Sequence, residues 1–92
     1  MGSDGDDVLA GTPGPDVMAG LGGDDVIRAG GGDDIVCGGE GDDVLVGQEG
    51  DDVVCGGDAD DVLIGQGGND TLAGEAGSDQ TVGGPGEDVA ED

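Results

Sequence analysis

The chain of 92 residues has no aromatic residue, no His and no Lys, and Arg28 is its only basic side chain. A conventional core built around large rings is therefore excluded. The lack of His makes classical zinc or copper chemistry an unsuitable explanation for any metal site. The formal net charge of −23 excludes nucleic acids and anionic membranes as partners, and it favours cations or basic proteins.

Long apolar runs are also missing. No stretch of the sequence approaches the roughly 18 consecutive apolar residues of a membrane span. The N-terminus, MGSDGDDV, lacks the basic and apolar regions of a cleavable signal peptide. We interpret residues 1–4 as a leader or cloning scar and residues 5–92 as one repeat domain, which is all that this length allows.

What the sequence does contain is an aspartate at every ninth position, which we call the register aspartate. A repeat this short is one structural unit copied along an axis, so its carboxylates stack in rows. Such rows repel one another unless a cation lies between them, and the period therefore points to metal. A disordered linker has no reason to keep such a period, although without metal we expect the chain to be largely unfolded. The register aspartates are Asp7, Asp16, Asp25, Asp34, Asp43, Asp52, Asp61, Asp70, Asp79 and Asp88.

Each nonapeptide predicts one short strand between two turns. In residues 41–49, GDDVLVGQE, a three-residue aliphatic stretch lies between glycines that permit tight turns. Side chains alternate along a strand, so the middle residue of each stretch faces opposite to its neighbours and builds the interior. The expected interior residues are Leu9, Met18, Ile27, Val36, Leu45, Val54, Leu63, Leu72, Thr81 and Ala90.

The repeats follow the pattern GGxGxDxUx, where U is a large aliphatic residue. Residues 38–46, GGEGDDVLV, match every fixed position, whereas residues 29–37 and 56–64 each differ at one Gly. Essentially the whole chain resembles the calcium-binding nonapeptide of the RTX (repeats-in-toxin, haemolysin-type) family. The resemblance implies an all-β fold, a right-handed parallel β-roll (a β-helix solenoid) with two nonapeptides per turn and about five turns. Residues 18 apart would then stack on adjacent strands, about 4.8 Å apart.

The resemblance also implies up to about eight calcium ions, each held between stacked turns by register aspartates and backbone carbonyls of the GGxG segments. The chemistry of the donors agrees, since hard oxygen ligands on flexible loops suit calcium better than magnesium. We expect binding to drive folding, with the best-formed loops between Gly23 and Asp70. Besides the register aspartates, the expected ligands are Gly30, Gly32, Gly39, Gly41 and Gly57.

Many repeats have a second acid directly before the register aspartate. We favour reading these residues as solvated charges on the rim of the roll, and the alternative is extra field strength that favours trivalent lanthanides over calcium. Examples of this second acid are Asp24, Asp33, Asp42, Asp51 and Asp60.

Two features do not follow from the repeat. Cys37 and Cys55 lie 18 residues apart, so the resemblance makes them direct neighbours; free thiols are favoured, with a disulfide or a soft-metal site as alternatives. The outward strand positions are unusually apolar, which indicates either β-propensity or sheet-to-sheet self-association of a homo-oligomer. These positions are Val8, Val26, Val44, Val62, Val46, Ile64 and Val82 on one face and Val17, Ile35 and Val53 on the other.

The leading functional hypothesis is a calcium-binding module that folds when calcium is abundant. By resemblance, such modules belong to extracellular, secreted proteins. The alternative is a structural or adhesive spacer that metal merely stiffens. We do not expect an enzyme, because the chain lacks His, Lys and Tyr and shows no arrangement of nucleophile and base.

Overall fold

A computed structural model describes residues 5–75, 77–84 and 89–91, and side chains only up to residue 84. The regular elements are ten strands of three or five residues. The described chain has no helix with the length and apolar character needed to cross a membrane. The strands are β1 (Val8–Ala10), β2 (Val17–Ala19), β3 (Val26–Arg28), β4 (Ile35–Gly39), β5 (Val44–Val46), β6 (Val53–Gly57), β7 (Val62–Ile64), β8 (Thr71–Ala73), β9 (Gln80–Val82) and β10 (Val89–Glu91).

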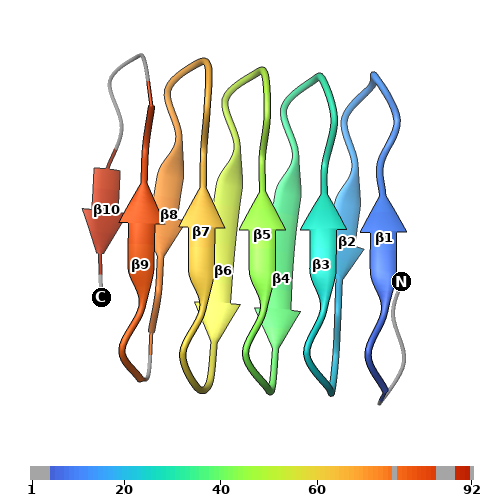
Figure 1. Ribbon diagram of the computed structural model, residues 1–92. Helices are drawn as coiled ribbons and strands as arrows, with labels where there is room; N and C mark the ends of the chain where they lie inside the picture. The colour runs from blue at the N-terminus through green and yellow to red at the C-terminus, as the bar shows by residue number, and fades with distance from the viewer. Residues whose placement is uncertain (1–4, 76, 85–88, 92) are drawn as a thin grey trace.

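The strands form two parallel sheets of five strands each, ordered β1-β3-β5-β7-β9 and β10-β8-β6-β4-β2. Pairing joins residues 18 apart, such as Val8 with Val26 and Val17 with Ile35. The chain rises along one sheet, descends along the other and advances sideways, which is a right-handed coil (Figure 1). The ten strands amount to about four and a half turns. The predicted parallel β-roll, with two nonapeptides per turn, is confirmed.

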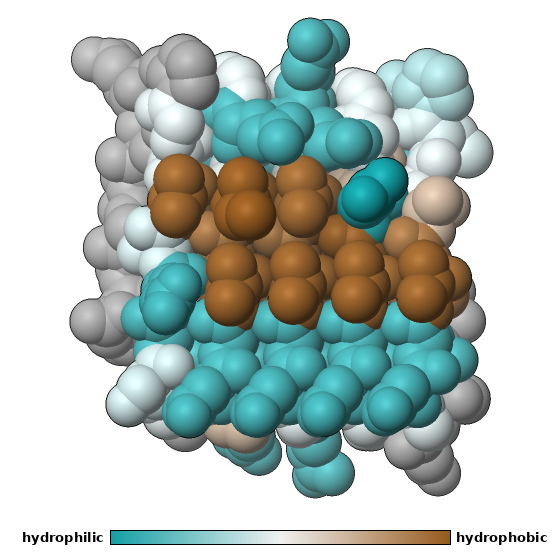
Figure 2. Space-filling model, viewed as in Figure 1, coloured by the Kyte–Doolittle hydropathy of each residue, from teal (hydrophilic) through white to brown (hydrophobic). Residues whose placement is uncertain are grey.

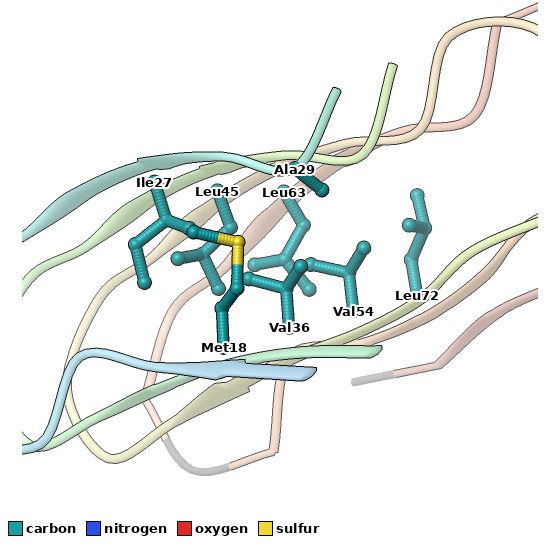
Figure 3. Close-up of a cluster of buried hydrophobic side chains, with 8 residues drawn as sticks. All are labelled: Met18, Ile27, Ala29, Val36, Leu45, Val54, Leu63 and Leu72. Atoms are coloured by element: carbon teal, nitrogen blue, oxygen red, sulfur yellow. The ribbon is translucent and has the colours of Figure 1, made fainter. Parts of the chain in front are cut away.

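The core consists of two facing rows of apolar side chains, one from each sheet. Side chains from the two layers point toward one another (Figure 3), as the alternation along each short strand requires. Leu9 and Thr81, near the ends of the stack, are only partly buried. Ala90 is the one expected interior residue whose side chain lies outside the described part. The buried hydrophobic residues are Met18, Ile27, Ala29, Val36, Leu45, Val54, Leu63 and Leu72.

The turns between the strands depend on positive φ angles at two positions of each typical repeat. Gly39 and Gly41, with φ of 89° and 95°, occupy these positions in one turn. Glycine adopts such angles without steric cost. Equivalent positions elsewhere hold other residues at positive φ, namely Leu21, Gln48, Ala59, Gln66 and Glu75. Stacking fixes the backbone conformation even where the residue type does not favour it.

Candidate metal centre

The register aspartates lie at the inner side of the turns, immediately before each strand. Six of them are only 1% exposed although they carry an ionisable group. Asp7, Asp16 and Asp79 are half-buried, and Asp88 lies outside the described residues. Burial of a carboxylate is costly unless it is paired or binds a metal. The six buried members are Asp25, Asp34, Asp43, Asp52, Asp61 and Asp70.

One oxygen of the register carboxylate joins adjacent turns. Asp43 donates its backbone N–H to Oδ1 of Asp61 at 2.8 Å, and Asp25 donates in the same way to Asp43 at 2.7 Å. The bond repeats along both edges of the roll. The structure therefore brings together the register aspartates that the sequence predicted as stacked pairs.

The other oxygen, Oδ2, is buried without a hydrogen-bond partner in at least six repeats. Native proteins leave few buried polar atoms unsatisfied, and each one calls for an explanation such as an ion. A bound cation is the usual partner of a buried charge of this kind. The six residues are Asp25, Asp34, Asp43, Asp52, Asp61 and Asp79.

Burial makes these carboxylates reluctant to ionise in the absence of metal. Desolvation, reinforced by neighbouring carboxylates, raises the pKa of Asp43 to about 6. The same causes raise the pKa of Asp52 and of Asp61 to about 7, and the pKa of Asp34 also rises. A nearby positive charge would reverse this preference and keep the carboxylates charged.

Beside most of these unpartnered oxygens, the first residue of the turn is a Gly, which leaves a space without a side chain. A Cβ on Gly56 would lie 2.6 Å from Oδ2 of Asp61 and 2.8 Å from the carbonyl oxygen of Gly74, in the next turn. Gly20 and Gly38 repeat this arrangement. A carboxylate oxygen and a main-chain carbonyl thus face one small space, and both are hard donors of the kind that calcium accepts. The residues fit the ion.

A metal ion at such a site would need main-chain carbonyl oxygens among its ligands. In the described part of the chain, no group of three or more Asp, Glu or Cys side chains is placed to hold an ion. The five predicted ligand glycines have positive φ, and a Cβ on any of them would meet backbone atoms of the preceding turn. They therefore allow the turns to stack closely. The sequence analysis missed the first glycines Gly20 and Gly56, which lie five residues before a register aspartate.

Two turns depart from the pattern. Thr12 donates its backbone N–H to Oδ2 of Asp16 at 2.8 Å, and its Oγ1 lies 3.0 Å from Oδ1. Both oxygens of Asp16 thus have a local polar partner, although Gly11 leaves a bare space beside Oδ2 as the other first glycines do. In the next turn on that edge, Ala29 stands five residues before Asp34 and is fully buried. By equivalence with Gly56, its methyl group occupies the space beside that carboxylate.

The second acids form a separate, exposed row. Asp42 donates its backbone N–H to Oδ1 of Asp24 at 2.8 Å, and Asp60 donates to Asp42 at 3.0 Å. These carboxylates accept from the following turn, whereas the register aspartates accept from the preceding one. Their exposure agrees with the expected rim, and the hydrogen bonds add a stacking role that the sequence analysis missed.

We call the small space between the register carboxylate and the first Gly a cradle. A parallel solenoid whose turns hold such cradles has the architecture of a metal-binding β-roll. The family model of the RTX calcium-binding nonapeptide repeat (4 copies) matches residues 1–36, 35–63 and 56–90. The chain belongs to this family, whose repeats indicate a calcium-binding module. A search of curated proteins finds no match.

Proposed function

We propose that this module folds when calcium binds in its turns, at the cradles between a register carboxylate and the first Gly. The observation that carries the proposal is the buried, unpartnered Oδ2 beside a bare first Gly. At Gly20, Gly38 and Gly56 a main-chain carbonyl oxygen also bounds that space. When bound, calcium supplies positive charge between these oxygens. Gly also stands first at Gly11, but Thr12 already bonds to the carboxylate of that turn. We assign the ions to the turns in which a first Gly lies beside an unpartnered register oxygen, namely those that begin at Gly20, Gly38, Gly47, Gly56 and Gly74.

The charge of the chain supports folding on binding. A net charge of −23 opposes compaction, and stacking places the carboxylates in rows with raised pKa values. No complete set of donors exists in the unfolded chain, so the free energy of binding becomes free energy of folding. Without divalent ions at neutral pH, we expect the chain to be a coil.

A circular dichroism titration tests this proposal. Calcium is added to chelator-treated protein, with magnesium as the matched control because it prefers a stricter octahedron and retains its waters. The expected result is a cooperative change from coil to β at sub-millimolar to millimolar calcium, with little response to magnesium. A coil spectrum at saturating calcium, or an equal response to both ions, contradicts the proposal.

Self-association is a second proposal, supported by the outer surface of the β1-β3-β5-β7-β9 sheet. Figure 2 shows two apolar rows across this face, bordered by hydrophilic side chains. Val8, Val44 and Val82 are exposed there. Bound calcium would lower the repulsion between two copies, so we expect sheet-to-sheet dimers only with metal. A monomeric mass by light scattering at saturating calcium would contradict self-association.

The spacer and the lanthanide binder remain the alternative functions. The uninterrupted stack of strands (Figure 1) supports a spacer role, and the exposed acid row supports stronger binding of trivalent ions. Competition between terbium and calcium at equal concentration separates the two ions. An extracellular, secreted location is part of the same proposal, because calcium is abundant there.

A further inference from the structure

Cys37 and Cys55 occupy matching positions on adjacent strands of the β10-β8-β6-β4-β2 sheet. They are register partners in the β4–β6 pair, which extends to a further pair, Gly39 with Gly57. β4 and β6 are five residues long, against three in the other strands. The two thiols therefore lie side by side on the most extensively paired strands of the roll.

The two side chains are free and half-buried, and a side-chain hydrogen bond joins them. Burial, and after it a hydrogen bond with Cys37, raises the pKa of the Cys55 thiol to about 12. This shift keeps the attacking thiolate scarce at neutral pH, so the proposal rests on the side-by-side placement of the two thiols. On either side the same row continues with Ala19 and Ala73, which are register partners of the two cysteines. Small neighbours leave room for the thiols to change rotamer and for a small reagent to approach.

We propose that Cys37 and Cys55 form a thiol–disulfide exchange site that a small-molecule disulfide oxidises to a bond between adjacent turns. The thiolate of one cysteine attacks the reagent, forms a mixed disulfide and releases one small thiol. The second cysteine then attacks the protein sulfur of the mixed disulfide and releases the second small thiol. The two protons lost by the cysteines are taken up by the leaving thiolates, and the reagent is the oxidant.

The fold brings the cysteines within bonding range but not into an ideal geometry. Adjacent strands hold paired Cα atoms about 4.8 Å apart, inside the roughly 4.4–6.8 Å range of disulfides. Parallel side chains must turn toward each other, and strained disulfides are more easily reduced. The bond is therefore expected to be reversible under mild reducing conditions.

The bond would close a loop that contains two of the turns to which we assign an ion, at residues 38–43 and 47–52. A cross-link restricts the unfolded chain and so favours the folded one. This consequence rests on the proposed function: if calcium folds the roll, calcium and the bond must favour each other by the same factor. Several ions bind in the same folding transition, so the stabilisation by one bond is divided among them. We therefore expect the calcium concentration at the folding midpoint to fall only about two- to threefold on oxidation.

The test is exchange with oxidised glutathione, in calcium and in chelator, with products identified by mass spectrometry. The matched control is the double variant Cys55→Ala, Ala73→Cys, which moves one thiol to the next strand of the same row. Its Cα separation from Cys37 would be about 9.6 Å, beyond the roughly 7 Å limit for a disulfide. In calcium, we expect the natural pair to form the internal bond at least tenfold faster than the control.

In an unfolded chain the two pairs differ only in loop length, which accounts for about a threefold difference in rate. A ratio at or below that value in calcium overturns the exchange site. Circular dichroism of the same samples keeps the two proposals apart. A β spectrum with a low ratio overturns only the exchange site, whereas a coil spectrum in calcium overturns the proposed function.

Discussion

The turn that ends at Asp43 and the turn that ends at Asp16 have the same register aspartate but different partners for it. At Asp43, Oδ2 is buried without a hydrogen bond, and the first residue of the turn is the bare Gly38. At Asp16, Thr12 donates to the carboxylate from within the turn. The comparison shows that a register aspartate alone does not produce an unpartnered carboxylate oxygen.

The two turns also differ in how they join the stack. Asp43 accepts the backbone N–H of Asp25 through Oδ1, which leaves its second oxygen for an ion. The Thr12 contacts involve both oxygens of Asp16. We infer that the turn at Asp16 needs no metal and that it caps the N-terminal part of the roll, where a metal-dependent turn would fray.

The largest expected effect on stability and ion count comes from removing each of the two carboxylates separately. Asp43→Ala leaves the buried N–H of Asp25 without its acceptor, a loss of about 1–3 kcal/mol, and removes one ion. Asp16→Ala is expected to lose less stability and no ion. Urea unfolding at saturating calcium and equilibrium dialysis measure the two quantities. Asp43→Asn is the matched control, because it keeps an acceptor oxygen but removes the charge; equal ion loss in both alanine variants would break the comparison.

At low pH, protonation is expected to neutralise the buried register carboxylates in place of a metal ion. The pKa values of Asp43, Asp52 and Asp61 rise from 3.8 to about 6, 7 and 7 in the fold. The folded chain therefore binds more protons than the unfolded one, and its stability falls as pH rises from about 4 to 7. Metal-free protein should gain β signal in circular dichroism as pH is lowered through that range, and calcium affinity should fall. A metal-free β signal that increases with pH would contradict the assignment.

A methyl group in the cradle is expected to change the ion count by one. Gly38→Ala places a Cβ against Oδ2 of Asp43, and Ala29→Gly opens the equivalent space beside Asp34. The natural alanine indicates that the fold tolerates the methyl group. We expect one ion fewer in the first variant and one more in the second, by equilibrium dialysis. Unchanged counts in both would remove the role assigned to the first Gly.

The smallest effect is expected at Ala59, which sits at φ 75° where the equivalent Gly41 sits at 95°. Ala59→Gly relieves the left-handed conformation and should stabilise the roll by under about 1 kcal/mol. The ion count should stay constant. The reverse change, Gly41→Ala, brings a Cβ against the carbonyl of Gly23 and should destabilise it. Urea midpoints at saturating calcium compare the pair, and a loss of stability in Ala59→Gly would show that the backbone there is not strained.

The nine-residue period predicted most of the fold. Because every strand is the same unit, one alternation rule placed Ile27 and Leu45 inside. The resemblance to RTX repeats, which implies two nonapeptides per turn, paired Cys37 with Cys55. The rows of register aspartates followed from the period. These features depend on repetition, which a sequence displays directly.

The partner of each carboxylate oxygen could not be predicted in the same way. Whether Oδ2 of an aspartate meets a space or a donor depends on one nearby residue, such as Thr12 or Ala29. The register aspartates accept hydrogen bonds from the preceding turn and the second acids from the following turn. These opposite directions depend on side-chain rotamers, which the period does not encode. Gln48 and Ala59 adopt positive φ because the stack holds them there, against their own conformational preferences.

The central claim is that cations lie between the register carboxylate and the first Gly of the open turns. The most direct measurement is anomalous scattering from a crystal grown with terbium in place of calcium. The account predicts density beside Oδ2 of Asp43, Asp52 and Asp61 and none beside Asp16. Density confined to the exposed row of Asp24, Asp42 and Asp60 would contradict it.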